Sequence, residues 1–148
     1  MTAFSALRAL HLLSMALWFS IGFFWPGDVR RTLARGVPHV EALAERVERV
    51  LKTSLIAAFL TLGSGVGMIF QLGGMKALPT RMHAGIGLAL LLLGVEILLV
   101  DPAASKLFRA IADGKLDDAR AAGKKLPPLT GVTHLLKLAV FATMIVRI

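Results

Sequence analysis

The sequence predicts an all-α protein, an integral membrane four-helix bundle with a single domain. Of its 148 residues, 56% are hydrophobic and the mean hydropathy is +0.74. A soluble domain of this length cannot hide so much apolar sequence in its core. Four apolar stretches are each long enough to cross a hydrocarbon core, which needs ~20 helical residues. Cysteine is absent, which excludes disulfides, thiolate metal sites and cysteine catalysis.

The predicted spans cover residues 4–25, 53–72, 79–100 and 129–148. All four should be helical, because a helix satisfies its own backbone polar groups within lipid. The connection between the first two spans is long, and its second half, 38–52, is predicted to extend the second span as a helix. Pro38 suits the first turn of that helix, and Glu45 with Arg49 forms a favourable i,i+4 pair.

The third connection, residues 101–130, is also long and basic. Asp101 followed by proline resembles a helix N-cap, and Gly114 suits a helix end. We therefore expect a short amphipathic helix lying on the membrane surface, with Leu107 and Ile111 among its inward residues.

The distribution of basic residues predicts the topology. The first and third connections hold six Lys or Arg each, while the opposite side holds four. The positive-inside rule then places the long connections in the cytoplasm and both termini outside, in a multi-pass protein of a bacterial inner membrane. The N-terminus lacks a cleavable signal pattern, so the first stretch is predicted to be a retained span. Topology also accounts for the net charge of +8, and no nucleic acid partner is expected.

Histidine depth within the membrane selects a candidate site. Counting the helical rise from the outer ends of their spans, His11 and His83 come within roughly one turn of the same level. His134 enters from the inner side and should lie on the order of 10 Å or more away. Arg8 precedes His11 by one turn, and Arg81 precedes His83 by two residues, so both suit anionic groups near the outer interface. Ionisable residues inside a membrane are costly and point to a function.

These residues predict a b-type haem held between the first and third helices, near the outer face. Two histidines would be the axial ligands of the iron, arginines would pair with the propionates, and glycines would admit the porphyrin plane. The alternative is that the histidines only hydrogen-bond across the bundle. The predicted cofactor-binding residues are His11, His83, Arg8, Arg81, Met15, Trp18, Gly63, Gly67 and Gly87.

A second interpretation is copper binding, because thioether and imidazole ligands suit Cu(I). Met15 lies four residues after His11, and Met68 and Met75 lie toward the outer end of the second span. Met82 adjoins His83, although neighbouring residues on a helix point about 100° apart. Methionine is equally an ordinary core residue.

An inner polar group is predicted from Glu96 and Lys137, which lie at similar depth, with His134 on the lysine's face. An ion pair is the simpler interpretation, and a proton or electron-coupled relay is the alternative. Nothing else in the sequence has the pattern of a catalytic motif.

His11, followed by Trp18-Phe19 and then Gly22-Phe23-Phe24, resembles the first helix of the four-helix membrane protoporphyrinogen oxidases (HemJ). Met82-His83 at the start of a span resembles their third helix, and the layout also resembles the membrane domain of CopD copper-resistance proteins. The resemblance implies a haem-binding bundle with His11 as a ligand, acting in electron transfer or porphyrin oxidation. The sequence departs from the oxidases at Gly85, where they carry a lysine, so it favours haem binding over oxidase activity.

The expected partners follow from these interpretations. They are the lipid bilayer, and a redox partner, a larger membrane complex or a second copy of the chain. Copper transport or resistance is the alternative function, and the third is a small structural subunit whose histidines only pack helices.

Overall fold

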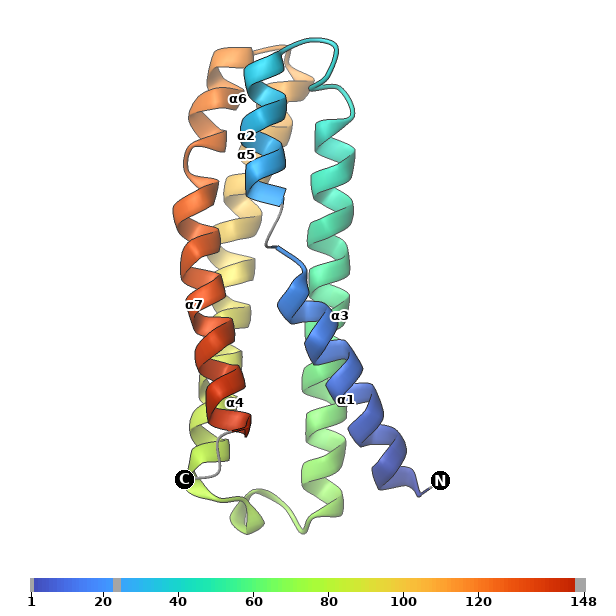
Figure 1. Cartoon of the computed structure of the whole chain (residues 1–148). Helices are drawn as coiled ribbons and strands as arrows, with labels where there is room; N and C mark the ends of the chain where they lie inside the picture. Colours follow the sequence, from blue (N-terminus) through green and yellow to red (C-terminus); the bar gives the residue numbers. More distant parts are fainter. Residues whose placement is uncertain (1, 23–24, 146–148) are drawn as a thin grey trace.

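The chain folds as an elongated bundle of helices in the computed structural model (Figure 1), which describes residues 2–22 and 25–145. The described residues form helices joined by turns. In chain order the elements are α1 Ala3–Ser20, α2 Trp25–Arg35, α3 Leu43–Gln71, the 3₁₀ turn η1 Met75–Ala77, α4 Thr80–Val95, the π-helical turn η2 Glu96–Val100, α5 Asp101–Ala112, α6 Leu116–Gly123 and α7 Leu126–Ile145. The all-α prediction is confirmed.

Three stretches are long and apolar enough to cross a membrane: Ala3–Arg35, Leu43–Gln71 and Thr80–Ala112. They match the first three predicted spans. The fourth predicted span coincides with α7 as far as residue 145 and is not among the three, and its last residues, 146–148, lie outside the described part of the chain. The 29 residues of α3 measure about 44 Å at 1.5 Å per residue, so this helix is longer than a hydrocarbon core of about 30 Å.

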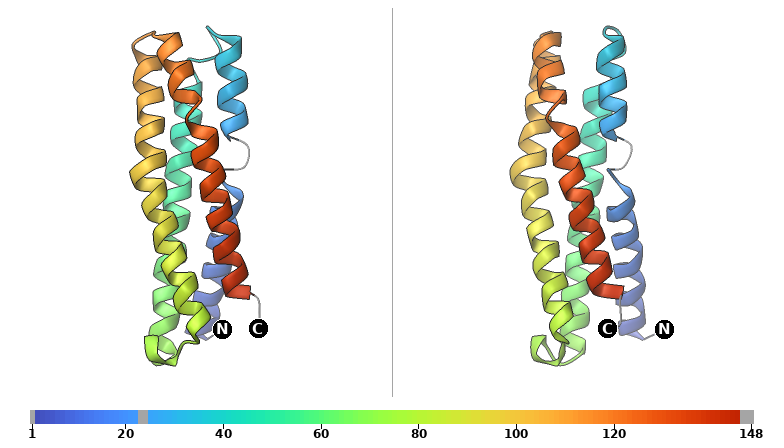
Figure 2. Two further views of the ribbon diagram at one scale, coloured as in Figure 1. Left: turned by 90° about the vertical axis from the view of Figure 1, so that its left-hand side faces the viewer. Right: turned by 60° about the vertical axis from the view of Figure 1, so that its left-hand side comes forward.

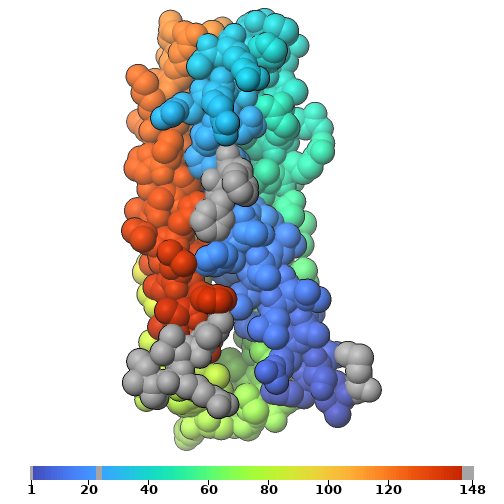
Figure 3. Space-filling view, in the orientation of Figure 1, coloured from blue at the N-terminus to red at the C-terminus, as the bar shows by residue number. Residues whose placement is uncertain are grey.

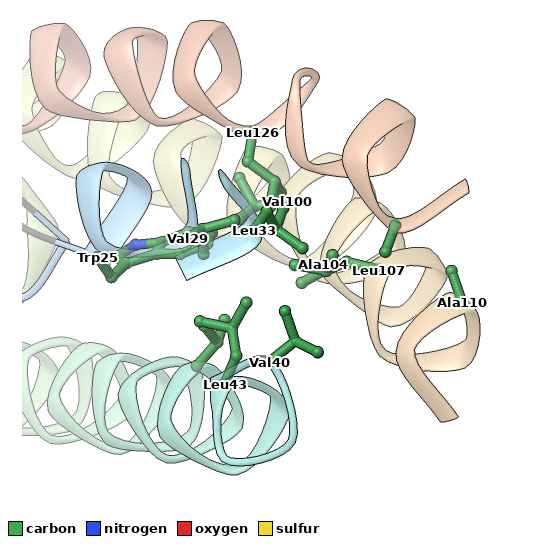
Figure 4. Close-up of a cluster of buried hydrophobic side chains, with 12 residues drawn as sticks. Trp25, Val29, Leu33, Val40, Leu43, Val100, Ala104, Leu107, Ala110 and Leu126 are labelled. Carbon is green, nitrogen blue, oxygen red and sulfur yellow. The ribbon is translucent and has the colours of Figure 1, made fainter. Parts of the chain in front are cut away.

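The helices pack in two pairs along most of the bundle. α1 packs against α3, and α4 packs against α7 (Figure 2). At the end where α5 and α6 lie, α2 packs against α6 and α3, and a shared apolar core joins these elements (Figure 4). That core comprises Trp25, Val29, Leu33, Val40, Leu43, Val47, Val100, Ala104, Leu107, Ala110, Ala119 and Leu126.

Two predictions about the third connection are wrong. α4, η2 and α5 follow one another without a break, so Asp101 lies within a continuous helical run rather than at an N-cap. The apolar face of α5, with Leu107 fully buried, packs into the shared core instead of lying on a membrane surface. The amphipathic pattern was real, but the apolar face is covered by α2, α6 and α3. Gly114 does end α5, with a φ of +69° that favours glycine.

The first connection also differs from expectation. α1 ends at Ser20, and Trp25, the predicted end of the first span, is instead the first residue of α2. Gly22 has a φ of +113°, which a helix cannot contain, so the chain turns before α2 begins. Pro38 lies in a turn, and α3 begins only at Leu43. The predicted pairing of Glu45 with Arg49 is present at 2.7 Å.

Candidate functional site

The two helix pairs leave a cavity of about 580 Å³ between them. Side chains from α1 and α3 line one wall, and side chains from α4 and α7 line the other. The surface is hollowed where α7 and α1 diverge (Figure 3). This volume falls within the roughly 300–1,000 Å³ typical of pockets for small molecules and cofactors. The cavity lies in the half of the bundle away from the shared core, on the side of both chain ends.

His11 of α1 lines this cavity, and its ring contacts α3. Its Nδ1 lies 2.8 Å from the carbonyl oxygen of Thr61. A carbonyl can only accept, so Nδ1 carries the proton and Nε2 keeps its lone pair. Metal-binding histidines are commonly oriented in this way, through a second-shell carbonyl that fixes the tautomer.

Small residues of α3 make this ring position available. A Cβ at Gly65 would lie 3.2 Å from Cε1 of His11, so a larger residue there would push the imidazole away. Ser64 adds a hydroxyl 3.3 Å from Nδ1. Beneath the ring, the buried Thr61 hydroxyl donates to Ser14 at 3.0 Å, which ties α1 to α3 by a polar contact.

Arg81 of α4 lines the same cavity from the opposite wall. Its Nε is buried and has no hydrogen-bond partner among the described residues. A buried, unsatisfied cationic donor is costly in a protein, and an anionic ligand in the cavity would satisfy it. Arg8 of α1 also lines the cavity and is exposed, so it stands at the opening.

His83 does not join His11. Its side chain is exposed, it does not line the cavity, and its Nδ1 lies 3.3 Å from the carbonyl of Pro79 on its own helix. The α4 face toward the cavity instead carries Met82, Ile86 and Ala89. The structure therefore does not bring the two predicted axial ligands together.

The remaining predicted cofactor residues divide between the cavity and other places. Met15 and Trp18 line the cavity. Gly63 and Gly87 do not, and a Cβ at either would meet nothing within 4 Å, so no close approach requires glycine there. Gly67 packs against the side chain of Leu7 and closes the contact between α1 and α3.

Methionines surround the cavity more fully than the sequence indicated. The predicted candidates Met15 of α1, Met68 of α3 and Met82 of α4 line the cavity, and Met144 of α7 lines it with them. Met75, also a candidate, does not line the cavity. Met144 was missed, although it falls seven residues after Lys137 and so lies on the same face of α7. Among the described residues, no group of three His, Cys, Asp or Glu side chains is arranged to hold a metal ion.

At the inner end of the cavity, Glu96 and Lys137 form a buried ion pair. The separation between Lys137 Nζ and Glu96 Oε1 is 3.1 Å, and the side chains are 5% and 11% exposed for Lys137 and Glu96 respectively. The indole N–H of Trp18 donates to the other carboxylate oxygen at 2.9 Å. Lys137 also donates to the carbonyls of Trp18 and Ile21, at 2.9 and 3.2 Å. The pair expected from equal depth is present, and it connects the end of α1 to α4 and α7.

His134, the third member of the predicted inner group, does not line the cavity. A Cβ at Gly22 would lie 3.5 Å from its Nε2, so this histidine packs beside the turn that follows α1. Gly85, where the oxidases carry a lysine, packs against α7. A Cβ there would lie 2.8 Å from Cε of Met144 and 2.9 Å from Oγ1 of Thr143, so a larger residue would require these side chains to shift.

Comparisons of the chain with models of protein families, with curated proteins and with solved structures find no match.

Proposed function

We propose that this chain is an integral membrane protein whose bundle crosses a bacterial inner membrane. Three stretches of sufficient length and apolar character support this. Large apolar side chains also face outward around the bundle, such as Leu13, Phe70 and Leu98, which are 71%, 78% and 71% exposed. A lipid environment removes the cost of exposing them, which water would not. The basic connections favour α2, α5 and α6 on the cytoplasmic side, with both termini outside.

We further propose that the cavity binds haem b, with His11 as the protein ligand to iron. The observation that carries this proposal is the orientation of His11, whose Nδ1 is fixed by the Thr61 carbonyl and whose Nε2 keeps a lone pair. A haem needs an imidazole nitrogen of this kind and a largely apolar pocket. Bound haem would supply one-electron redox chemistry at its iron.

The arginines would hold the propionates of that haem. Arg81 has a buried Nε without a partner among the described residues, and Arg8 stands at the opening, so both can meet carboxylates of a ligand. Because His83 lies outside the cavity, His11 would be the single histidine ligand. A single histidine ligand favours a redox enzyme over a simple electron carrier.

A spectrum of the purified protein tests the haem proposal. The full chain is extracted in detergent, and its visible spectrum is recorded oxidised and reduced. We expect a haem b spectrum that is lost in His11→Ala and retained in His83→Ala, the matched control from the exposed face. A colourless wild-type protein that also fails to take up added haem contradicts the proposal. Loss of the spectrum in His83→Ala alone would contradict the assignment of His11.

Copper handling is the second candidate, and one observation favours it. Four methionines, one from each wall helix, surround the cavity that holds His11. Thioethers and an imidazole suit Cu(I), so the chain could serve copper transport or resistance. Stoichiometric copper in a colourless protein, lost on His11→Ala, would establish this function in place of haem binding. Absence of both ligands would leave a structural subunit of a larger complex, or a homo-oligomer, as the role.

Membrane topology is tested with single cysteines, which is straightforward because the chain has none. Lys76→Cys in η1 should react with an impermeant thiol reagent from outside, and Lys115→Cys between α5 and α6 should not. Labelling of the second position from outside would reverse the proposed orientation.

A further inference from the structure

A second, smaller cavity lies next to the ion pair, toward the end of the bundle that carries the shared core. Its volume is about 30 Å³, and a cavity needs roughly 10–15 Å³ to hold one water. It therefore has room for about two waters. Its polar lining includes Ser54 of α3, Asp101 of α5, and Thr130 and Thr133 of α7.

The two cavities meet at the ion pair. Lys137 lines both of them, and Glu96 lines the small one. Asp101 also lines the small cavity and is exposed, and it lies one residue beyond the predicted third span, 79–100. The threonine hydroxyls donate to backbone carbonyls of their own helix, which leaves their oxygens able to accept from water. From the surface inward, the order is therefore Asp101, the small cavity with space for water, the pair of Glu96 and Lys137, and the large cavity.

The backbone is irregular at this point. η2, the π-helical turn of Glu96–Val100, lies within the run from α4 to α5. Such turns are rare and occur frequently at functional sites. Glu96 is its first residue, so the irregular turn begins at the carboxylate of the pair.

We propose that Asp101, the waters of the small cavity, Glu96 and Lys137 form a proton-transfer route from the inner solution to the ligand cavity. The Lys137 ammonium gives one proton to an acceptor atom of the bound ligand. A proton entering at Asp101 passes over the waters to the Glu96 carboxylate and on to the Lys137 amine. Both residues regain their starting charges, one proton has moved, and the protein neither gains nor loses an electron. The receiving ligand rests on the proposed function, whereas the hydrated route does not.

The groups around Glu96 are few. Lys137 pairs with it from α7, and His134 on the same helix is close enough to interact electrostatically with both. Asp101 approaches from α5, while α3 contributes the uncharged Ser54 and α1 the Trp18 indole. Thr130 lines the small cavity and not the large one, so its side chain reports water on the proposed route.

The first test measures magnetisation transfer from water to the side chain of Thr130 by NMR, with the full chain in lipid nanodiscs. Ser54→Leu fills the small cavity, and Ser54→Ala is the matched control that leaves it open. We expect at least tenfold weaker transfer in Ser54→Leu and unchanged transfer in Ser54→Ala. Thr133→Leu fills the same cavity from α7 and should act alike, which covers the case in which the first variant does not fold. Transfer as strong as in wild type in a folded, filled variant overturns the proposal.

The second test follows the uptake of a proton after rapid reduction of bound haem, with a pH-indicator dye in weakly buffered solution. A residue on the route controls the rate of this uptake, so Glu96→Gln should slow it at least tenfold. An unchanged rate overturns the role of Glu96. A protein without a haem spectrum contradicts the proposed function, and the first test still decides the hydrated route.

Discussion

Lys137→Met measures how strongly the buried ion pair holds the two helix pairs together. The substitution keeps an unbranched side chain but removes the ammonium that contacts Glu96 at 3.1 Å and two carbonyls near the end of α1. Removing one partner of a buried pair costs about 3–5 kcal/mol. We expect a loss near the lower end, about 3 kcal/mol, because the Trp18 indole still donates to the carboxylate.

The assay is unfolding in mixed micelles of dodecyl sulfate and a mild detergent, followed by far-UV circular dichroism. Lys76→Met is the matched control, because Lys76 is exposed in η1, and we expect a change within about 0.5 kcal/mol. Adding Glu96→Gln to Lys137→Met removes the uncompensated charge and should recover most of the lost stability. A single variant as stable as the control, or a double variant no more stable than the single, would refute the reasoning.

Three further substitutions address the helix contacts and the cavity. Gly85→Ala should destabilise the protein by about 1–3 kcal/mol in the same unfolding assay, because its Cβ collides with α7, whereas Gly87→Ala should stabilise the helix by up to about 1 kcal/mol. Gly65→Ala should displace the imidazole of His11 and weaken haem binding, measured by titration with added haem, while far-UV circular dichroism stays unchanged. Arg81→Gln should weaken haem binding by about tenfold or more in that titration, since a hydrogen bond between charged groups contributes about 1.5–3 kcal/mol; equal affinity would remove the propionate role.

The level of a residue along the bundle axis could be predicted from the sequence, and rotation about the helix axis could not. Counting residues placed Glu96 opposite Lys137, and the two are in contact. The same counting placed His11 and His83 at one level, but a level includes every direction around a helix. Met82, about 100° from His83, is the residue that faces the cavity. The choice between them depends on α4 packing against α7, which no local pattern in either helix specifies.

The amphipathic face of α5 shows a second limit. Its pattern correctly indicated an apolar stripe through Leu107, yet a stripe of this kind can be covered by lipid or by protein. Here α2 was missing from the prediction, and it is one of the elements that complete the cover. Because α2 was not predicted, the face of α5 that packs into the shared core was expected to contact the membrane. The haem and copper interpretations depend on a bound ligand, and they stay predictions.

The shared core connects the two helix pairs at one end of the bundle only. The apolar side chains around Leu107 and Leu43 join α3, α5 and α7 at one end of the bundle, while at the other end the two pairs make few contacts with each other. The separation of the two pairs around the large cavity therefore depends on the angle at which each pair leaves the shared core. A small repacking around Leu43 and Leu107, which lie more than 20 residues from His11 along the chain, would therefore change the width of the large cavity and its fit to a bound ligand.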